Sequence, residues 1–129
     1  KDEPADLIIT RAAFHHLPDF WKQVALLKMN SMLKIGGILY IFDVVFNFSP
    51  KEYEREIDAW ISGFELKAGA NFRHEVETHI REEYSTFNWI LEGMIERSGV
   101  KTVKSRTPDG FLTEYHCVKV EDIMFAGPA

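Results

Sequence analysis

Two adjacent histidines, His15 and His16, are the first residues of this sequence whose chemistry stands out. Imidazole titrates near neutral pH and is a common zinc ligand, so the pair favours a general base or a metal site. A metal cluster needs further ligands, and the remaining histidines lie at spacings that define no known motif: His74, His79 and His116. We therefore predict no metal ligands. We expect one histidine of the pair to pack under its loop and the other to face a pocket, as a base for a hydroxyl or amine substrate.

Asp43 is the second candidate for chemistry, because it lies near the end of a long apolar run. Residues 37–46 are apolar almost throughout and do not alternate, which is typical of a central parallel strand. Ligand sites in parallel sheets lie at the carboxyl ends of the strands, and a buried carboxylate there needs a partner or a ligand. Asp43 therefore joins His15 and His16 as a candidate catalytic residue.

The elements that position these residues follow from the spacing of the apolar residues. Residues 5–10 form a short β-branched run after a proline, which favours a strand buried on both faces. Apolar residues then repeat at helical spacing, so a helix is predicted over about residues 19–33, with a left-handed cap at Gly36-Gly37. Together with the strand at 37–46, this order predicts a right-handed crossover between two parallel strands.

The second half of the chain reads as helices followed by a hairpin. The segment 49–52, Ser-Pro-Lys-Glu, predicts a helix start with a capping serine and a reciprocal glutamate. Three stripes at helical spacing follow, the first ending at Gly69 and the last at Gly99: residues 53–64, 72–80 and 87–95. Residues 100–107 and 111–120 read as strands joined by a turn at 108–110, so the chain is predicted to end in an antiparallel hairpin.

Composition predicts one domain and argues against several classes of protein. With 129 residues, 46% of them hydrophobic, the chain is long and apolar enough for one core. No apolar run approaches the roughly 20 residues that a membrane-spanning helix needs. A net charge of -5, with both signs mixed along the chain, predicts no basic surface that would bind nucleic acid or anionic lipid. The single Cys117, expected as a small buried hydrophobe, forms no internal disulfide, so we expect a reducing compartment, the cytoplasm.

The motifs and their order also carry a resemblance to a known enzyme family. Residues 5–19 read ADLIITRAAFHHLPD and are followed by the predicted helix and by LKIGGIL at 33–39. This order resembles the class I S-adenosylmethionine-dependent methyltransferases, in which a fourth strand ends in a loop reading roughly hHHLpD and an LKPGG turn precedes the fifth strand. The helix ending in ERSGV at 96–100 resembles the helix before that family's last two strands, and the hairpin matches as well. Ile35 stands where the family has a proline, and Val100 where it usually has a phenylalanine.

The resemblance spans residues 5–120 and implies an α/β fold, the carboxy-terminal half of a Rossmann-like methyltransferase sheet. Residues 1–129 would then form a single partial methyltransferase domain. The family's glycine-rich cofactor loop and its ribose-binding acidic residue would lie upstream of this chain, which begins without methionine and resembles an excised piece. Gly36-Gly37 enters a strand and so does not replace that loop. We expect the parent protein to use S-adenosylmethionine and this chain alone to bind little or none.

The same resemblance implies where cofactor and substrate would lie. The loop after the first strand would pass beside the methionine and sulfonium part of the cofactor, with contacts from Thr10, Arg11 and Ala12. Insertions at the position of residues 47–83 form a lid over the acceptor in this family, here a small molecule. We expect the aromatic residues at helical spacing in this segment to be helix core: Tyr53, Trp60 and Phe64. Three residues outside that stripe are the substrate-binding candidates: His79, Arg81 and Tyr84.

Two other functions stay open. Without its upstream neighbour, the strand at 5–10 would expose an unpaired apolar edge, which favours an assembly module that pairs with a second copy or with the missing half. The remaining alternative is a metal-dependent hydrolase that uses His15, His16 and Asp19.

Overall fold

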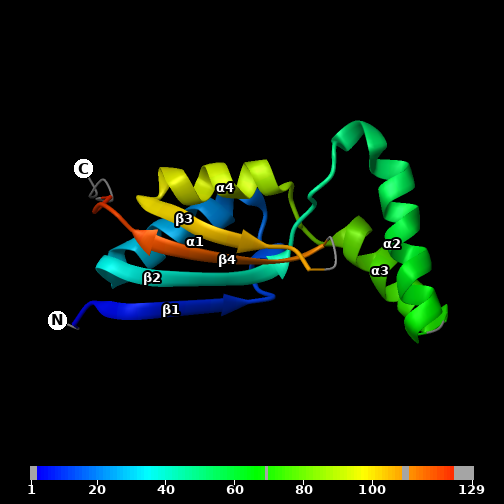
Figure 1. The fold of residues 1–129 in the computed structure, drawn as a ribbon, viewed down its shortest axis with the longest axis horizontal. Helices are drawn as coiled ribbons and strands as arrows, with labels where there is room; N and C mark the ends of the chain where they lie inside the picture. Colours follow the sequence, from blue (N-terminus) through cyan, green and yellow to red (C-terminus); the bar gives the residue numbers. More distant parts are fainter. Residues whose placement is uncertain (1–2, 69, 109–110, 124–129) are drawn as a thin grey trace.

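A mixed four-stranded sheet, with strand order β1-β2-β4-β3, organises the chain (Figure 1). The computed structural model describes residues 3–68, 70–108 and 111–123. The strands are β1 (Ala5–Arg11), β2 (Leu33–Val44), β3 (Val100–Arg106) and β4 (Leu112–Lys119). Strand β1 runs parallel to β2, and β4 runs antiparallel to both β2 and β3. The predicted α/β fold, with a parallel pair and a terminal antiparallel hairpin, is confirmed.

Helices α1 (Asp19–Met32) and α4 (Asn88–Arg97) pack against each other and against the sheet, whereas α2 (Tyr53–Ala68) and α3 (Ala70–Glu82) form an antiparallel arm beyond the end of the strands (Figure 1). The core lies between the sheet and the first pair of helices. Its fully buried side chains include Leu26, Leu39, Ile41, Ile95 and Tyr115. In the described ranges, no helix is both long and apolar enough to cross a membrane.

The expectation that the first strand is buried on both faces is wrong for this chain. Strand β1 is an edge strand, and Leu7 and Ile9 are 52% and 63% exposed. Burial alternates along β2 as well: Leu39 and Ile41 are buried, whereas Ile38 is 43% exposed. Apolar runs predict burial of both faces, but α1 and α4 cover only one. The chain therefore leaves an apolar strip over β1 and β2 uncovered.

The Gly36-Gly37 pair does not cap the first helix. Helix α1 ends at Met32, and Gly36, at a φ of +85°, lies inside β2. The pairing of β2 with β1 changes register here, between Ala5 and Leu7. The left-handed glycine therefore makes an irregularity in the strand rather than a helix cap.

The start of the arm also differs from the prediction. A 3₁₀ turn, η2 (Pro50–Glu52), precedes α2, and the Ser49 side chain makes no capping hydrogen bond. The Glu52 N–H donates to the Ser49 carbonyl oxygen at 2.9 Å instead. Tyr53, expected on the inner face, is 52% exposed. Gly69, the side chains of Phe64 and Phe72, and Asp109-Gly110 of the predicted turn lie outside the described residues.

Gly99 ends α4 and turns the chain into β3, as predicted. Its φ is +74°, and an added Cβ would lie 2.7 Å from the Glu121 carbonyl oxygen and 2.8 Å from Asn30 Nδ2. We expect Gly99→Ala to lower the free energy of unfolding by about 1–3 kcal/mol, since backbone strain and crowding add. Chemical denaturation followed by circular dichroism measures this change.

Gly63 provides the matched control for that substitution. It lies inside α2, and an added Cβ would meet nothing within 4 Å. Gly63→Ala should therefore raise stability by about 0.5–1 kcal/mol, because alanine has the higher helix propensity. Equal effects of the two substitutions would show that crowding at Gly99 is unimportant.

Candidate active site

The candidate site lies where the parallel strands β1 and β2 end. After β1, the 3₁₀ turn η1 (Phe14–His16) carries both histidines of the predicted pair. Asp43 is the penultimate residue of β2. Because Thr10 pairs with Ile41, the two strands end side by side and bring Asp43 under η1. The carboxyl edge of the parallel pair therefore collects the three predicted catalytic residues.

Asp43 is a buried carboxylate whose oxygens are fully engaged. It is 2% exposed, and its Oδ2 accepts a hydrogen bond from the Phe14 N–H at 2.7 Å. Its Oδ1 accepts the Val44 N–H at 2.8 Å and lies 2.7 Å from His15 Nδ1. Charge-assisted bonds of this kind offset the cost of burying a carboxylate. Asp43 therefore fixes both the turn and the imidazole above it.

That contact orients His15. Since the Asp43 oxygens are acceptors, His15 Nδ1 is the donor, and in the neutral ring the lone pair then lies on Nε2. His15 is buried, whereas the side chain of His16 is 62% exposed. His15 is therefore the histidine of the pair that packs under the loop, and Nε2 is left as its basic atom. The other half of the prediction, that the second histidine faces a pocket as the base, stays a prediction.

Glu83 completes the cluster and was missed by the sequence reasoning. It follows α3 directly, and its Oε2 lies 3.1 Å from His16 Nδ1 and 3.6 Å from His15 Nε2. Its Oε1 lies 2.6 Å from His79 Nδ1. The spacing of His79 and Glu83, four residues apart on a predicted helix, was the available signal.

His79, a predicted substrate-binding residue, is brought into the same cluster. Its ring centroid lies 4.8 Å from that of His15, and its Nε2 lies 2.8 Å from Ser85 Oγ. Burial lowers the pKa of His79, although Glu83 opposes this shift. Trp60 approaches the ring edge-on, with 6.0 Å between centroids. The arm therefore contributes His79 and Glu83 to the site.

Lys22, a second residue that the sequence reasoning missed, ties the arm to the histidine turn. It is only 1% exposed, and its ammonium donates to the Leu17 carbonyl at 2.5 Å and to the Tyr84 carbonyl. Asp19 Oδ1 lies 3.3 Å away, and burial lowers the pKa of Lys22. The Tyr84 N–H also donates to the His15 carbonyl at 2.7 Å. These bonds hold the end of the arm against η1.

The other predicted substrate residues contribute less. The backbone of Tyr84 is part of the cluster, but its side chain is largely in solvent, with 51% of the residue exposed. Arg81 is exposed on the last turn of α3. Trp60, expected as helix core, stacks on Phe111 with 4.2 Å between ring centroids. Aromatic packing therefore joins the arm to the end of the sheet.

The residues predicted to touch the cofactor lie at the end of β1. Thr10 is 8% exposed, and the Arg11 guanidinium lies over the Phe42 ring, 4.5 Å from its centroid. Ala12 has a φ of +54° and donates its N–H to the Phe42 carbonyl at 2.8 Å. That Thr10, Arg11 and Ala12 contact the cofactor stays a prediction. A glycine-rich turn after a strand, as the family uses, does not occur before Gly36.

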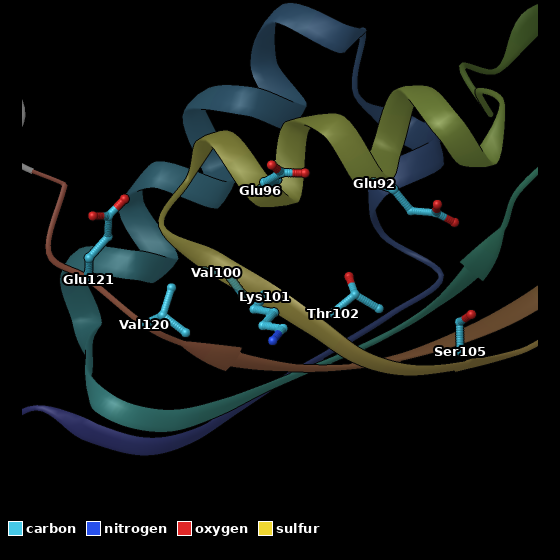
Figure 2. A pocket seen from close by; sticks show the side chains of 8 residues that line it. All are labelled: Glu92, Glu96, Val100, Lys101, Thr102, Ser105, Val120 and Glu121. Carbon is cyan, nitrogen blue, oxygen red and sulfur yellow. The ribbon is translucent and has the colours of Figure 1, made fainter.

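A groove of about 670 Å³ lies elsewhere, between α4 and β3 (Figure 2). Glu92 and Glu96 of α4 line it on one side, and Lys101 and Thr102 of β3 line it on the other. None of the predicted site residues lines it. The groove is thus separate from the histidine cluster.

Comparison with known proteins bears on what this cluster does. No protein-family profile matches the chain. It is 30% identical over 101 residues to an uncharacterized methyltransferase of Bacillus cereus, a match that covers 78% of this chain and 43% of that protein. The resemblance to the methyltransferases is confirmed. This chain spans less than half the length of that methyltransferase relative.

Solved structures show the same fold. An O-methyltransferase family 2 protein from Planctomyces limnophilus, in complex with apigenin, superposes with a TM-score of 0.61 at 18% identity, over 92% of this chain and 31% of that one. LepI, in complex with S-adenosylmethionine, gives a TM-score of 0.59 at 10% identity, over 91% and 27% of the two chains. At these identities the likeness shows the methyltransferase fold alone.

Proposed function

We propose that the complete protein transfers a methyl group from S-adenosylmethionine to a small-molecule acceptor, and that this chain forms the carboxy-terminal half of its class I domain. The observation that carries the proposal is the contact between His15 Nδ1 and the buried Asp43, at the carboxyl ends of the parallel strands. Relatives named methyltransferases support it, as does LepI, a neighbour of the same fold solved with this cofactor.

The side chains of the cluster suit an acceptor that loses a proton. S-adenosylmethionine, when bound, supplies a methyl group on a positively charged sulfur, so positioning provides most of the catalysis. His15 Nε2 takes the proton from a hydroxyl or amine group of the acceptor. Asp43 holds the ring by Nδ1 and stabilises the imidazolium that forms. The arm formed by residues 47–83, which carries His79 and Glu83, covers the acceptor as a lid.

The cofactor would rest against the end of β1, with contacts from Thr10, Arg11 and Ala12. The missing half of the domain would supply the glycine-rich turn and would cover the apolar strip that includes Leu7 and Ile9.

The experiment that tests the proposed function is transfer of labelled methyl groups to a panel of small hydroxyl and amine acceptors. The complete protein should methylate at least one of them, and the 129-residue chain alone should not. We also propose a reducing compartment, the cytoplasm, because the single Cys117 has no partner for an internal disulfide.

A second candidate function is assembly through β1. In the described sheet β1 is an edge, and its exposed Leu7 and Ile9 make this edge apolar. Its partner would be the missing half or a second copy. We expect the mass of the isolated chain in light scattering to rise with concentration. A constant monomer mass at high concentration would argue against assembly.

The metal-dependent hydrolase that uses Asp19 gains no support from the geometry. The Asp19 carboxylate is paired with Lys22. Across the described residues, the three potential metal-ligand atoms that lie close together come from His15, His16 and Glu83, and not from Asp19.

A further inference from the structure

His15, His16 and Glu83 present three metal-binding atoms to one point. One nitrogen of each histidine and one carboxylate oxygen all lie within 4.8 Å of one another. Glu83 Oε2 is 3.1 Å from His16 Nδ1 and 3.6 Å from His15 Nε2. A tetrahedral zinc ion with bonds of about 2.0–2.2 Å needs ligand atoms about 3.3–3.6 Å apart, so the widest separation, within 4.8 Å, must shorten when a cation binds, and the exposed His16 side chain can make that adjustment. We propose that these three residues bind one divalent transition-metal cation, with Zn²⁺ as the best fit.

Hydrogen bonds outside the cluster already orient two of the three ligands. Asp43 holds His15 by Nδ1, which directs the Nε2 lone pair toward Glu83. His79 Nδ1 lies 2.6 Å from Glu83 Oε1, and Ser85 Oγ lies 2.8 Å from His79 Nε2. A carboxylate behind a ligating imidazole is the usual support of protein zinc sites. The arrangement therefore has the outer contacts of a metal site as well as the ligands.

A plain ion pair between a protonated His15 and Glu83 accounts less well for the same geometry. At 3.6 Å, His15 Nε2 and Glu83 Oε2 are too far apart for a hydrogen bond. Glu83 Oε2 is therefore near His15 Nε2 without bonding to it directly. A cation between the two atoms engages both lone pairs.

The site is open on one side. The side chain of His16 is 62% exposed and that of Glu83 is 27% exposed, so a cation can enter from solvent. Three protein ligands leave a fourth position for water or an acceptor oxygen, as in catalytic zinc sites. A cation bound at His15 Nε2 would prevent that atom from acting as a base; it would instead polarise the acceptor oxygen, whose proton would pass to solvent water.

Sequence spacing argued against a metal site because His15 and His16 had no third ligand nearby. The fold supplies that ligand as Glu83, from the end of α3. The inference does not rest on methyl transfer, because metal binding is measured on the chain without cofactor or acceptor. Either proposal can fail while the other stands.

The test is calorimetric titration of the tag-free chain with Zn²⁺ near pH 7.5, at one fixed pH because metal binding releases protons. A polyhistidine tag must be removed because it binds the same cation. We expect one Zn²⁺ per chain. Titration with Co²⁺ should also give the intense visible absorption of a four-coordinate complex.

His16→Ala and Glu83→Gln should each weaken binding at least ten-fold. His16 is exposed, so its removal leaves the fold intact even if Glu83→Gln does not fold. Asp43→Asn, which removes the carboxylate behind His15 and disturbs the turn that it fixes, should weaken binding by about 10–100-fold. His74→Ala is the matched control, because His74 is an exposed histidine of α3 outside the cluster. Absence of stoichiometric binding, or binding that His16→Ala leaves unchanged, would overturn the proposal.

Discussion

Replacing His15 by glutamine in the complete protein should slow methyl transfer by about 10²–10⁴-fold, the usual contribution of a positioned general base. Glutamine can still donate an N–H toward Asp43, which lies 2.7 Å from His15 Nδ1, but it has no basic nitrogen at the position of Nε2. The rate is measured with labelled S-adenosylmethionine and an acceptor that the wild type methylates. An unchanged rate would remove His15 from the mechanism.

The pH dependence separates a base from a residue that only shapes the site. As pH approaches the pKa of the acceptor, more acceptor is already ionised, and the variant should recover toward the wild-type rate. A purely structural loss would be the same at every pH. His74→Gln, an exposed substitution on α3, should leave the rate unchanged throughout. Asp43→Asn should reproduce part of the loss, since it disturbs the ring that Asp43 orients.

The elements of the fold were predictable where their signals are local. Apolar spacing and glycine placement predicted β1, α1, β2, α4 and the terminal hairpin, each close to its observed bounds. The Gly36-Gly37 pair shows the limit of such signals. A glycine pair after a helical pattern is typical of a helix cap. The pairing of β2 with β1 begins at Leu33, however, so both glycines lie inside the strand. Pairing between the strands, and not the local glycine signal, therefore determined the conformation of this segment.

Burial was harder to predict than secondary structure. The apolar runs at 5–10 and 37–46 predicted strands covered on both faces. The described helices α1 and α4 cover one face, and Leu7, Ile9 and Ile38 remain exposed on the other. The apolar runs therefore predicted the strands, but they did not show that one face of the sheet would lack a covering helix in the described residues.

The site was predictable in its strand-end residues and in His79 of the arm, but not in Glu83 or Lys22. Residue type and strand position selected His15, His16 and Asp43, because parallel strand ends are where such groups meet. Glu83 and Lys22 act across long separations: Lys22 binds the carbonyl of Tyr84, 62 residues away. Sequence spacing carries no signal for the contact of Lys22 with Tyr84 or of Glu83 with His15. Only the packing of the end of the arm against η1 reveals these contacts.

Lys22→Met should lower the free energy of unfolding by about 2–4 kcal/mol, because two part-buried carbonyls lose their donor at once. The ammonium of Lys22 donates to the carbonyls of Leu17 and Tyr84 and faces Asp19 at 3.3 Å. Methionine fills similar space without a donor. It removes the cost of burying the charge, which offsets part of the loss. The net change stays large because each unpaired carbonyl costs about 1–3 kcal/mol.

Lys28→Met is the control on the same helix, since Lys28 is exposed and its loss should change stability by no more than about 0.5 kcal/mol. Chemical denaturation of both variants gives the comparison, and equal stabilities would show that the Lys22 bonds contribute nothing.

The Lys22 variant should also release the arm, because the same ammonium binds the Tyr84 carbonyl and the Tyr84 N–H binds the His15 carbonyl. Faster amide exchange along α3, with α4 unchanged, would then show that Lys22 couples the arm to the histidine turn.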